Sequence, residues 1–172
     1  MSQTPLEKPN AAVALVKLAL FTFFVPGTVT VWAPRFFFRS AYVAHILENP
    51  ASLASGILLL ALGVAGYLWC ALDFAFAGHG TPAPIDPPKL LVVRGLYRYA
   101  RNPMYISVLL VLLGESVLFH SWTLCRYALA VWAGFHLFVL LYEEPTLRDK
   151  FGESYKEYCQ RVNRWLPRPP HS

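Results

Sequence analysis

Two polar strings flank an apolar stretch of about forty residues and carry the side chains best suited to chemistry. The first, Arg101-Asn102-Pro103-Met104-Tyr105, combines a cation, an amide and a phenol. The second, Glu143-Glu144-Pro145, sets two carboxylates side by side. Forty apolar residues suffice for one membrane helix out and one back, so the strings should meet on one side of a membrane. Because acidic residues at a helix C-terminus oppose the helix dipole, the pair suggests a cation to meet.

The composition indicates a membrane protein. Of 172 residues, 56% are hydrophobic and only 15% are charged, which is too apolar for an ordinary soluble domain. A membrane-spanning helix needs about 20 apolar residues. Four stretches qualify: Ala11–Ala33, Leu53–Ala77, Met104–Phe119 and Ser121–Tyr142. We expect an all-α membrane protein in a single domain over residues 1–172, with N-terminal helices in 1–77 and the polar strings in 78–168.

The basic residues predict the orientation. Four spans place both termini and the central loop on one side, which carries eleven Lys and Arg residues, whereas the other side carries only Arg35 and Arg39. Basic loops stay cytoplasmic, so we expect a multi-pass protein of the cell inner membrane with termini and active site on the cytoplasmic side. The net charge of +5 then serves contact with anionic membrane lipids and not with nucleic acid.

Three features refine the expected layout. Pro26-Gly27 should kink or break the first span. The aromatic segment Pro34–Pro50 could form an interfacial helix or part of a re-entrant pair. A charge inside the membrane needs a partner, and Glu115 and Arg126 are equidistant from the turn between the last two spans. We expect these two to pair across the hairpin.

The C-terminal segment has the period of an amphipathic helix. After Pro145 the apolar residues follow at gaps of three or four: Leu147, Phe151, Tyr155, Tyr158, Val162 and Trp165. We expect a cytosolic helix lying against the membrane face of the site. His136 precedes Glu143 by one heptad and is either a buried, hydrogen-bonded side chain or a substrate ligand. The three cysteines show no metal-ligand spacing, and we expect neither a disulfide nor a metal.

Together, the two strings resemble the isoprenylcysteine carboxyl methyltransferase family, a group that includes phospholipid-type amine methyltransferases. The shared patterns are Leu91-Val92-x-x-Gly95-x-Tyr97-x-x-x-Arg101-Asn102-Pro103-x-Tyr105 and Glu143-Glu144-x-x-Leu147-x-x-x-Phe151-Gly152-x-x-Tyr155-x-x-Tyr158-x-x-x-Val162-x-x-Trp165-x-Pro167. The resemblance covers roughly residues 79–168. It implies an integral membrane methyltransferase that uses S-adenosyl-L-methionine and acts on a lipophilic acceptor, either an isoprenylcysteine-like carboxylate or a lipid amine.

The resemblance also implies roles for individual residues. The cofactor would be held by Leu91, Val92, Tyr97, Asn102, Pro103, Met104, Tyr105 and Glu143. Glu143 suits an ammonium or a ribose hydroxyl, and Arg101 suits the carboxylate of the cofactor. Tyr97 and Tyr105 could stack on adenine or lie near the sulfonium. Arg101 and Glu144 are the catalytic candidates; an amine acceptor would need a base, for which Glu144 or a tyrosine is available.

The sequence departs from the family pattern at two informative positions. Many members have histidine where Asn102 stands, and asparagine does not titrate near neutral pH. Prenylcysteine-specific members have an arginine where Val139 stands, and valine cannot pair with a substrate carboxylate. The pattern thus indicates the methyl donor more firmly than the acceptor. Two other classes stay open: a membrane NADPH-dependent reductase of the sterol-reductase type, and a non-catalytic membrane scaffold that retains the fold.

Overall fold

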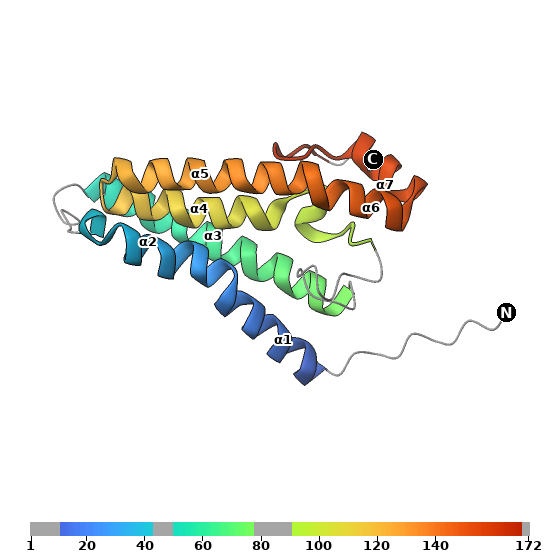
Figure 1. Cartoon of the computed structure of the whole chain (residues 1–172), viewed down its shortest axis with the longest axis horizontal. Helices are drawn as coiled ribbons and strands as arrows, with labels where there is room; N and C mark the ends of the chain where they lie inside the picture. The colour runs from blue at the N-terminus through green and yellow to red at the C-terminus, as the bar shows by residue number, and fades with distance from the viewer. Residues whose placement is uncertain (1–10, 43–49, 78–90, 170–172) are drawn as a thin grey trace.

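The computed structural model describes residues 11–42, 50–77 and 91–169, and within them the protein is helical. The α-helices are α1 (Ala11–Phe24), α2 (Ala33–Phe37), α3 (Pro50–Ala77), α4 (Pro103–Leu118), α5 (Trp122–Phe138), α6 (Glu144–Phe151) and α7 (Glu153–Arg161). Two π-helical segments, η1 (Thr28–Trp32) and η4 (Val139–Glu143), and two 3₁₀ turns, η2 (Arg39–Tyr42) and η3 (Gly95–Arg98), join them. Figure 1 shows α3, α4 and α5 running side by side, with α6 and α7 at one end.

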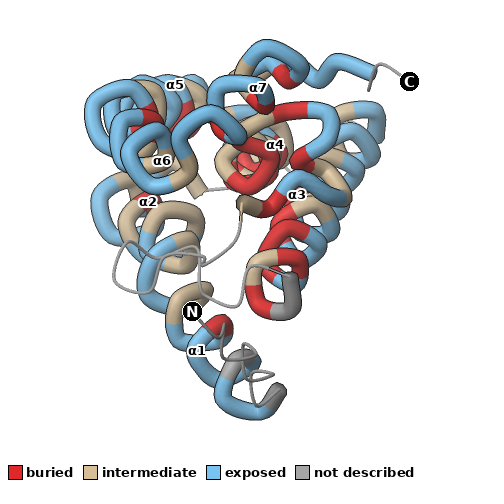
Figure 2. The backbone as a smooth tube through the Cα atoms, turned by 90° about the vertical axis from the view of Figure 1, so that its right-hand side faces the viewer, coloured by how far each residue is buried: buried red, intermediate tan, exposed pale blue. Residues whose placement is uncertain are grey.

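The predicted all-α membrane fold is confirmed. Three helical stretches are long and apolar enough to cross a membrane: Leu15–Phe37, Pro50–Ala75 and Trp122–Phe151. The fourth expected span is the shorter apolar helix α4, which packs against both α3 and α5. Buried residues gather on α4 and on the side of α3 that faces it (Figure 2). The outer faces carry exposed apolar side chains such as Leu141, because lipid and not protein would cover them.

The expected break in the first span occurs as the π-helical segment η1. In a π-helix each N–H bonds to the carbonyl five residues earlier. The donor for the Val29 carbonyl would be residue 34, but Pro34 has no N–H. The Tyr127 hydroxyl from α5 donates to this carbonyl instead, at 2.9 Å. A side chain thus satisfies the freed backbone group, as a break inside a membrane requires.

The structure addresses the segment Pro34–Pro50 only in part. Its first residues belong to α2, which directly continues the first span, and a 3₁₀ turn at Arg39–Tyr42 follows. Residues 43–49 lie outside the described residues, so the choice between an interfacial and a re-entrant segment stays a prediction for them.

The predicted pair of Glu115 with Arg126 is wrong. The Glu115 carboxylate accepts a hydrogen bond from the Tyr42 hydroxyl at 2.8 Å and lies 3.5 Å from the Arg35 guanidinium. Arg126 is exposed. Equal distance from the turn placed the two side chains at one depth, but it did not place them on facing sides of their helices. Glu115 faces the first span, which it ties to α4.

Glycines allow α3 and α4 to approach closely. A Cβ atom added to Gly63 would lie 2.7 Å from the Ser107 carbonyl oxygen and 2.9 Å from the Val111 nitrogen. Added to Gly114, it would lie 2.9 Å from the Leu60 nitrogen. Helices in membranes associate largely through packing, and small residues let their backbones come together. This glycine seam fixes α4, whose first residues carry one of the two polar strings.

Gly63→Ala is therefore expected to force the two helices apart and to lower the free energy of unfolding by about 1–3 kcal/mol, the usual cost of overpacking. Gly134→Ala on α5 is the matched control, because a Cβ there meets nothing within 4 Å. The control should be neutral or slightly stabilising, since alanine forms helices better than glycine. Thermal unfolding in detergent compares them, and equal melting temperatures would contradict the packing argument.

Candidate methyl-donor site

The π-helical segment η4 turns both glutamates of the second string inward. It continues α5, and the Glu144 N–H bonds to the Val139 carbonyl five residues earlier. This wider turn changes which residues share a helix face. Val139, at its start, and Glu144, directly after its end, are both buried. Pro145 follows η4 as Pro34 follows η1, two residues after the last π-helical residue. π-Helical turns often occur at functional sites.

The Glu143 carboxylate meets the first string directly. The Tyr105 hydroxyl on α4 donates to Glu143 Oε2 at 2.9 Å. The Tyr105 ring lies 4.6 Å from the ring of Phe135 on α5, which holds the phenol between the two helices. The two strings, 38 residues apart at this contact, therefore converge as the hairpin argument predicted.

The second glutamate lies at the centre of a cluster of arginines. Glu144 is 4% exposed, and its Oε1 atom is 3.0 Å from Nη1 of Arg101 and 2.7 Å from Nε of Arg164. Arg148, which is largely exposed, approaches Oε2 at 3.6 Å. Arg101 also donates to the Cys159 sulfur at 2.8 Å. Its Nε–H is buried and has no hydrogen-bond partner among the described residues.

The loop before α4 forms the opposite wall. Tyr97 is buried, and its ring lies 5.4 Å from that of Phe74 near the end of α3. The Tyr158 hydroxyl on α7 donates to the Tyr97 carbonyl at 2.7 Å. Arg94 Nε donates to Asp73 Oδ1 at 2.7 Å and thereby ties the loop to α3.

These walls enclose a pocket with about 930 Å³ of space between protein atoms, part of it open to solvent. Eight of the ten predicted site residues line it: Leu91, Val92, Tyr97, Arg101, Asn102, Tyr105, Glu143 and Glu144. Pro103 and Met104 do not; both are buried, and Met104 packs in the core with Tyr97.

Several lining residues were not predicted as site residues. On the η4 side they include Phe138, Tyr142 and Thr146, which recur at intervals of four and are exposed on the outer face of the helix. This regular spacing next to the acidic pair is the signal that could have found them. Phe74 had no comparable signal, because it is one of two phenylalanines near the end of a long, mostly apolar span.

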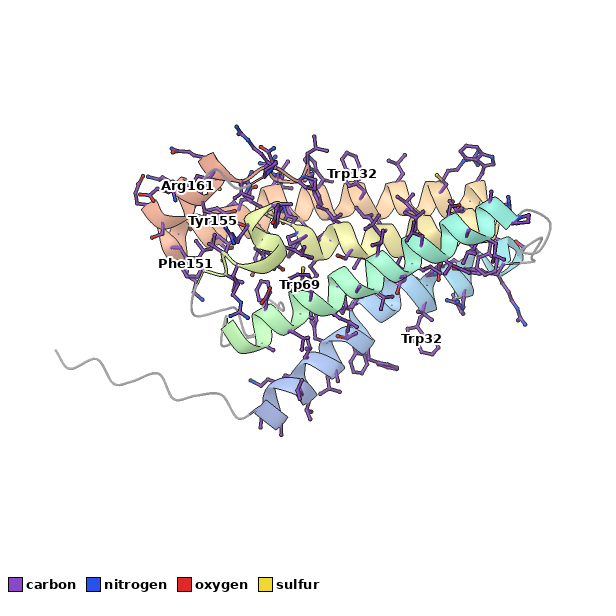
Figure 3. The ribbon with its side chains drawn as sticks, turned by 180° about the vertical axis from the view of Figure 1, so that it is seen from behind. Trp32, Trp69, Trp132, Phe151, Tyr155 and Arg161 are labelled. Carbon is purple, nitrogen blue, oxygen red and sulfur yellow. The ribbon has the colours of Figure 1, made fainter. Side chains whose placement is uncertain are left out.

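The C-terminal segment differs in two respects from the single amphipathic helix predicted for it: it is broken in the middle, and it ends at Arg161, so that Val162 and Trp165 lie beyond the helix. Gly152, at φ +54°, separates α6 from α7, and this left-handed backbone turns the chain back over the site. Tyr155 and Tyr158 of α7 are buried and line the pocket, as the period predicted. Figure 3 labels Tyr155. Burial raises the pKa of both phenols, so they stay neutral and can donate hydrogen bonds.

Of the two roles expected for His136, the structure supports a hydrogen-bonded structural side chain and not a substrate ligand. Its Nδ1 atom accepts a hydrogen bond from Trp165 Nε1 at 3.0 Å, and the Trp132 ring stacks on it at 5.5 Å between centroids. It is not among the residues that line the pocket. His136 therefore anchors the C-terminal segment to α5.

Comparison with known proteins agrees with this geometry. The model of the phospholipid methyltransferase family matches residues 51–154, which is more than half of the chain. The chain is 29% identical over 120 residues to the cobalt-zinc-cadmium resistance protein CzcN of Cupriavidus metallidurans, covering 70% of this chain and 51% of that protein. It is 32% identical over 93 residues to the protein-S-isoprenylcysteine O-methyltransferase of Schizosaccharomyces pombe, covering 54% of this chain and 39% of that enzyme.

A third relative is the probable protein-S-isoprenylcysteine O-methyltransferase of Oryza sativa subsp. indica, 35% identical over 78 residues, or 45% of this chain and 40% of that protein. The chain thus spans about two fifths to one half of the length of these relatives. The matched region contains both polar strings and most of the pocket. The resemblance read from the two strings is confirmed, and the chain belongs to the phospholipid methyltransferase family.

Proposed function

We propose that this protein is an integral membrane methyltransferase that moves a methyl group from S-adenosyl-L-methionine to a lipophilic acceptor. The observation that carries the proposal is that one pocket is lined by both the Arg101 guanidinium and the Glu143 carboxylate. The cofactor has a carboxylate for the first and an ammonium or ribose hydroxyl for the second. Family membership supports the same reaction.

The residues present fit this cofactor. Glu143 is held in place by the Tyr105 hydroxyl, and Tyr97 by Phe74 and Tyr158, so a bound ligand would meet fixed groups. When bound, S-adenosylmethionine would supply an electrophilic methyl group on its sulfonium. Methyl transfer is an in-line displacement, so the task of the protein is to align donor and acceptor and to exclude water.

The acceptor would enter along the apolar side of the pocket. Phe138 and Tyr142 line the pocket, are exposed, and belong to the last candidate membrane span. This supports a membrane-soluble acceptor, either an isoprenylcysteine-like carboxylate or a lipid amine. A carboxylate needs no base, whereas an amine must lose a proton, for which Glu144 or a pocket tyrosine is the candidate. The basic loops support a cytoplasmic site in the cell inner membrane.

Ligand binding to the purified protein in detergent tests the proposal. The wild type is expected to bind S-adenosylmethionine, and Glu143→Gln to weaken this binding at least tenfold, or about 1.4 kcal/mol. Glu153→Gln is the matched control, because Glu153 is exposed at the start of α7, where its carboxylate lies 3.0 Å from Lys156 Nζ. Isothermal titration calorimetry gives the affinities, and transfer of a labelled methyl group to a membrane lipid extract gives the activity.

NADPH serves as the competing ligand in the same titration. Binding of NADPH without S-adenosylmethionine would replace the proposal with the reductase alternative. A protein that binds neither ligand would favour the scaffold alternative. Unchanged affinity in Glu143→Gln would reject the assignment of this residue.

A further inference from the structure

The C-terminal residues 162–168, here called the tail strap, lie across the loop that begins the first polar string. The Arg101 N–H donates to the Asn163 carbonyl at 2.9 Å, and the Arg168 N–H donates to the Tyr99 carbonyl at 2.9 Å. The Asn102 side chain donates to the Arg164 carbonyl at 3.1 Å. The strap lies beyond residue 154, where the match to the family model ends.

One side chain of the strap reaches into the site. Arg164 forks over the Glu144 carboxylate, with Nε 2.7 Å from Oε1 and Nη2 3.0 Å from Oε2. A bidentate fork of this kind fixes the plane of a carboxylate more firmly than a single contact does. Arg101 shares Oε1 through its Nη1 atom at 3.0 Å. The orientation of Glu144 therefore decides where the Arg101 guanidinium lies.

The charges of the cluster point the same way. Three guanidinium groups surround the Glu144 carboxylate: Arg101 at 12% exposure, Arg164 at 29%, and the largely exposed Arg148. Without Arg164, the carboxylate would lose its bidentate partner, and Arg101 could turn to bind both carboxylate oxygens. The Arg101 guanidinium would then leave its present place in the pocket wall.

We infer that Arg164 is a positioning residue of the methyl-donor site: it holds Glu144, and through it the Arg101 guanidinium, at the pocket wall where Arg101 would meet the carboxylate of the bound donor. This inference rests on the proposed function. Arg148 cannot take over, because it is largely exposed and reaches only one carboxylate oxygen at 3.6 Å. Arg161 lies at the outer edge of α7 and contacts Glu157 (Figure 3).

The test compares two ligands that differ in the amino-acid group. S-adenosylhomocysteine carries the carboxylate, and 5′-methylthioadenosine lacks it. In Arg164→Gln, affinity for S-adenosylhomocysteine should fall at least tenfold, while affinity for 5′-methylthioadenosine should change less than twofold. Arg164→Lys keeps the charge but loses the fork and should give an intermediate loss. Arg161→Gln is the matched control and should bind both ligands as the wild type does.

A purely structural role would weaken both ligands equally or lower only the melting temperature, and either result would overturn the inference. A second check uses Glu144→Gln, in which Arg164→Gln should cause little further loss, because the two residues act as one unit. Full additivity would also overturn it. A wild type that binds neither ligand would instead reject the proposed function, which separates the two failures.

Discussion

Replacement of Glu144 by alanine is expected to lower the free energy of unfolding by about 3–5 kcal/mol and to abolish methyl-donor binding. The carboxylate is the common partner of Arg101, Arg164 and Arg148. The Arg101 side chain is only 12% exposed, so water could not solvate its charge unless the side chain moved out of its present position. Removing one partner of a buried pair leaves an uncompensated charge, which costs far more than the pair contributes.

The measurement is unfolding in detergent together with donor binding. Glu157→Ala removes an exposed carboxylate that contacts Arg161 and should change stability by no more than about 0.5 kcal/mol. Glu144→Gln keeps the shape of the side chain and one acceptor oxygen. Its stability should therefore lie between those of Glu144→Ala and Glu157→Ala. The argument is wrong if Glu144→Ala unfolds with the same free energy as Glu157→Ala.

The spans and the meeting of the two polar strings could be predicted from the sequence. Both depend on one-dimensional quantities: the length of each apolar run and the number of spans between the strings. The approach of the two strings, seen in the bond between Tyr105 and Glu143, follows from these quantities, because a hairpin returns the chain to its starting side. The period of the C-terminal segment likewise placed Tyr155 and Tyr158 toward the site.

Helix faces could not be predicted in the same way. Glu115 pairs with Arg35 and Tyr42, because rotation of a helix about its axis depends on its neighbours and not on distance from a turn. The π-helical turns are a related case, since one extra residue per turn shifts the face that a residue occupies. Their only sequence signal is a proline two residues beyond, at Pro34 and Pro145.

The contact of Arg164 with Glu144 could not be predicted from the sequence for a different reason. Arg164 is one of several arginines in a basic tail, and it falls at an unspecified position of the family pattern, between Val162 and Trp165. Only the backbone bonds of the tail strap bring it to Glu144, twenty residues away. Contacts made by irregular segments have no period for a sequence pattern to reveal.

Replacement of Gly95 by alanine is expected to be as damaging as loss of Glu144, for two reasons that add. Gly95 has a φ of +55°, where an L side chain costs about 1–3 kcal/mol. A Cβ there would also overlap the Asp73 carboxylate and lie 2.8 Å from Trp69 Nε1. Asp73 is buried, so it cannot yield without breaking its bond to Arg94.

Gly152→Ala separates these two causes. Gly152 has nearly the same φ, +54°, but a Cβ on it meets nothing within 4 Å, so only the backbone strain applies. The control should lose about 1–3 kcal/mol of stability and still bind the donor. Gly95→Ala should lose more stability and at least a hundredfold in donor affinity, because Tyr97 follows two residues later and depends on the same loop. Equal losses in the two variants would show that backbone strain alone explains Gly95, and that the Arg94–Asp73 contact does not hold Tyr97 in the pocket.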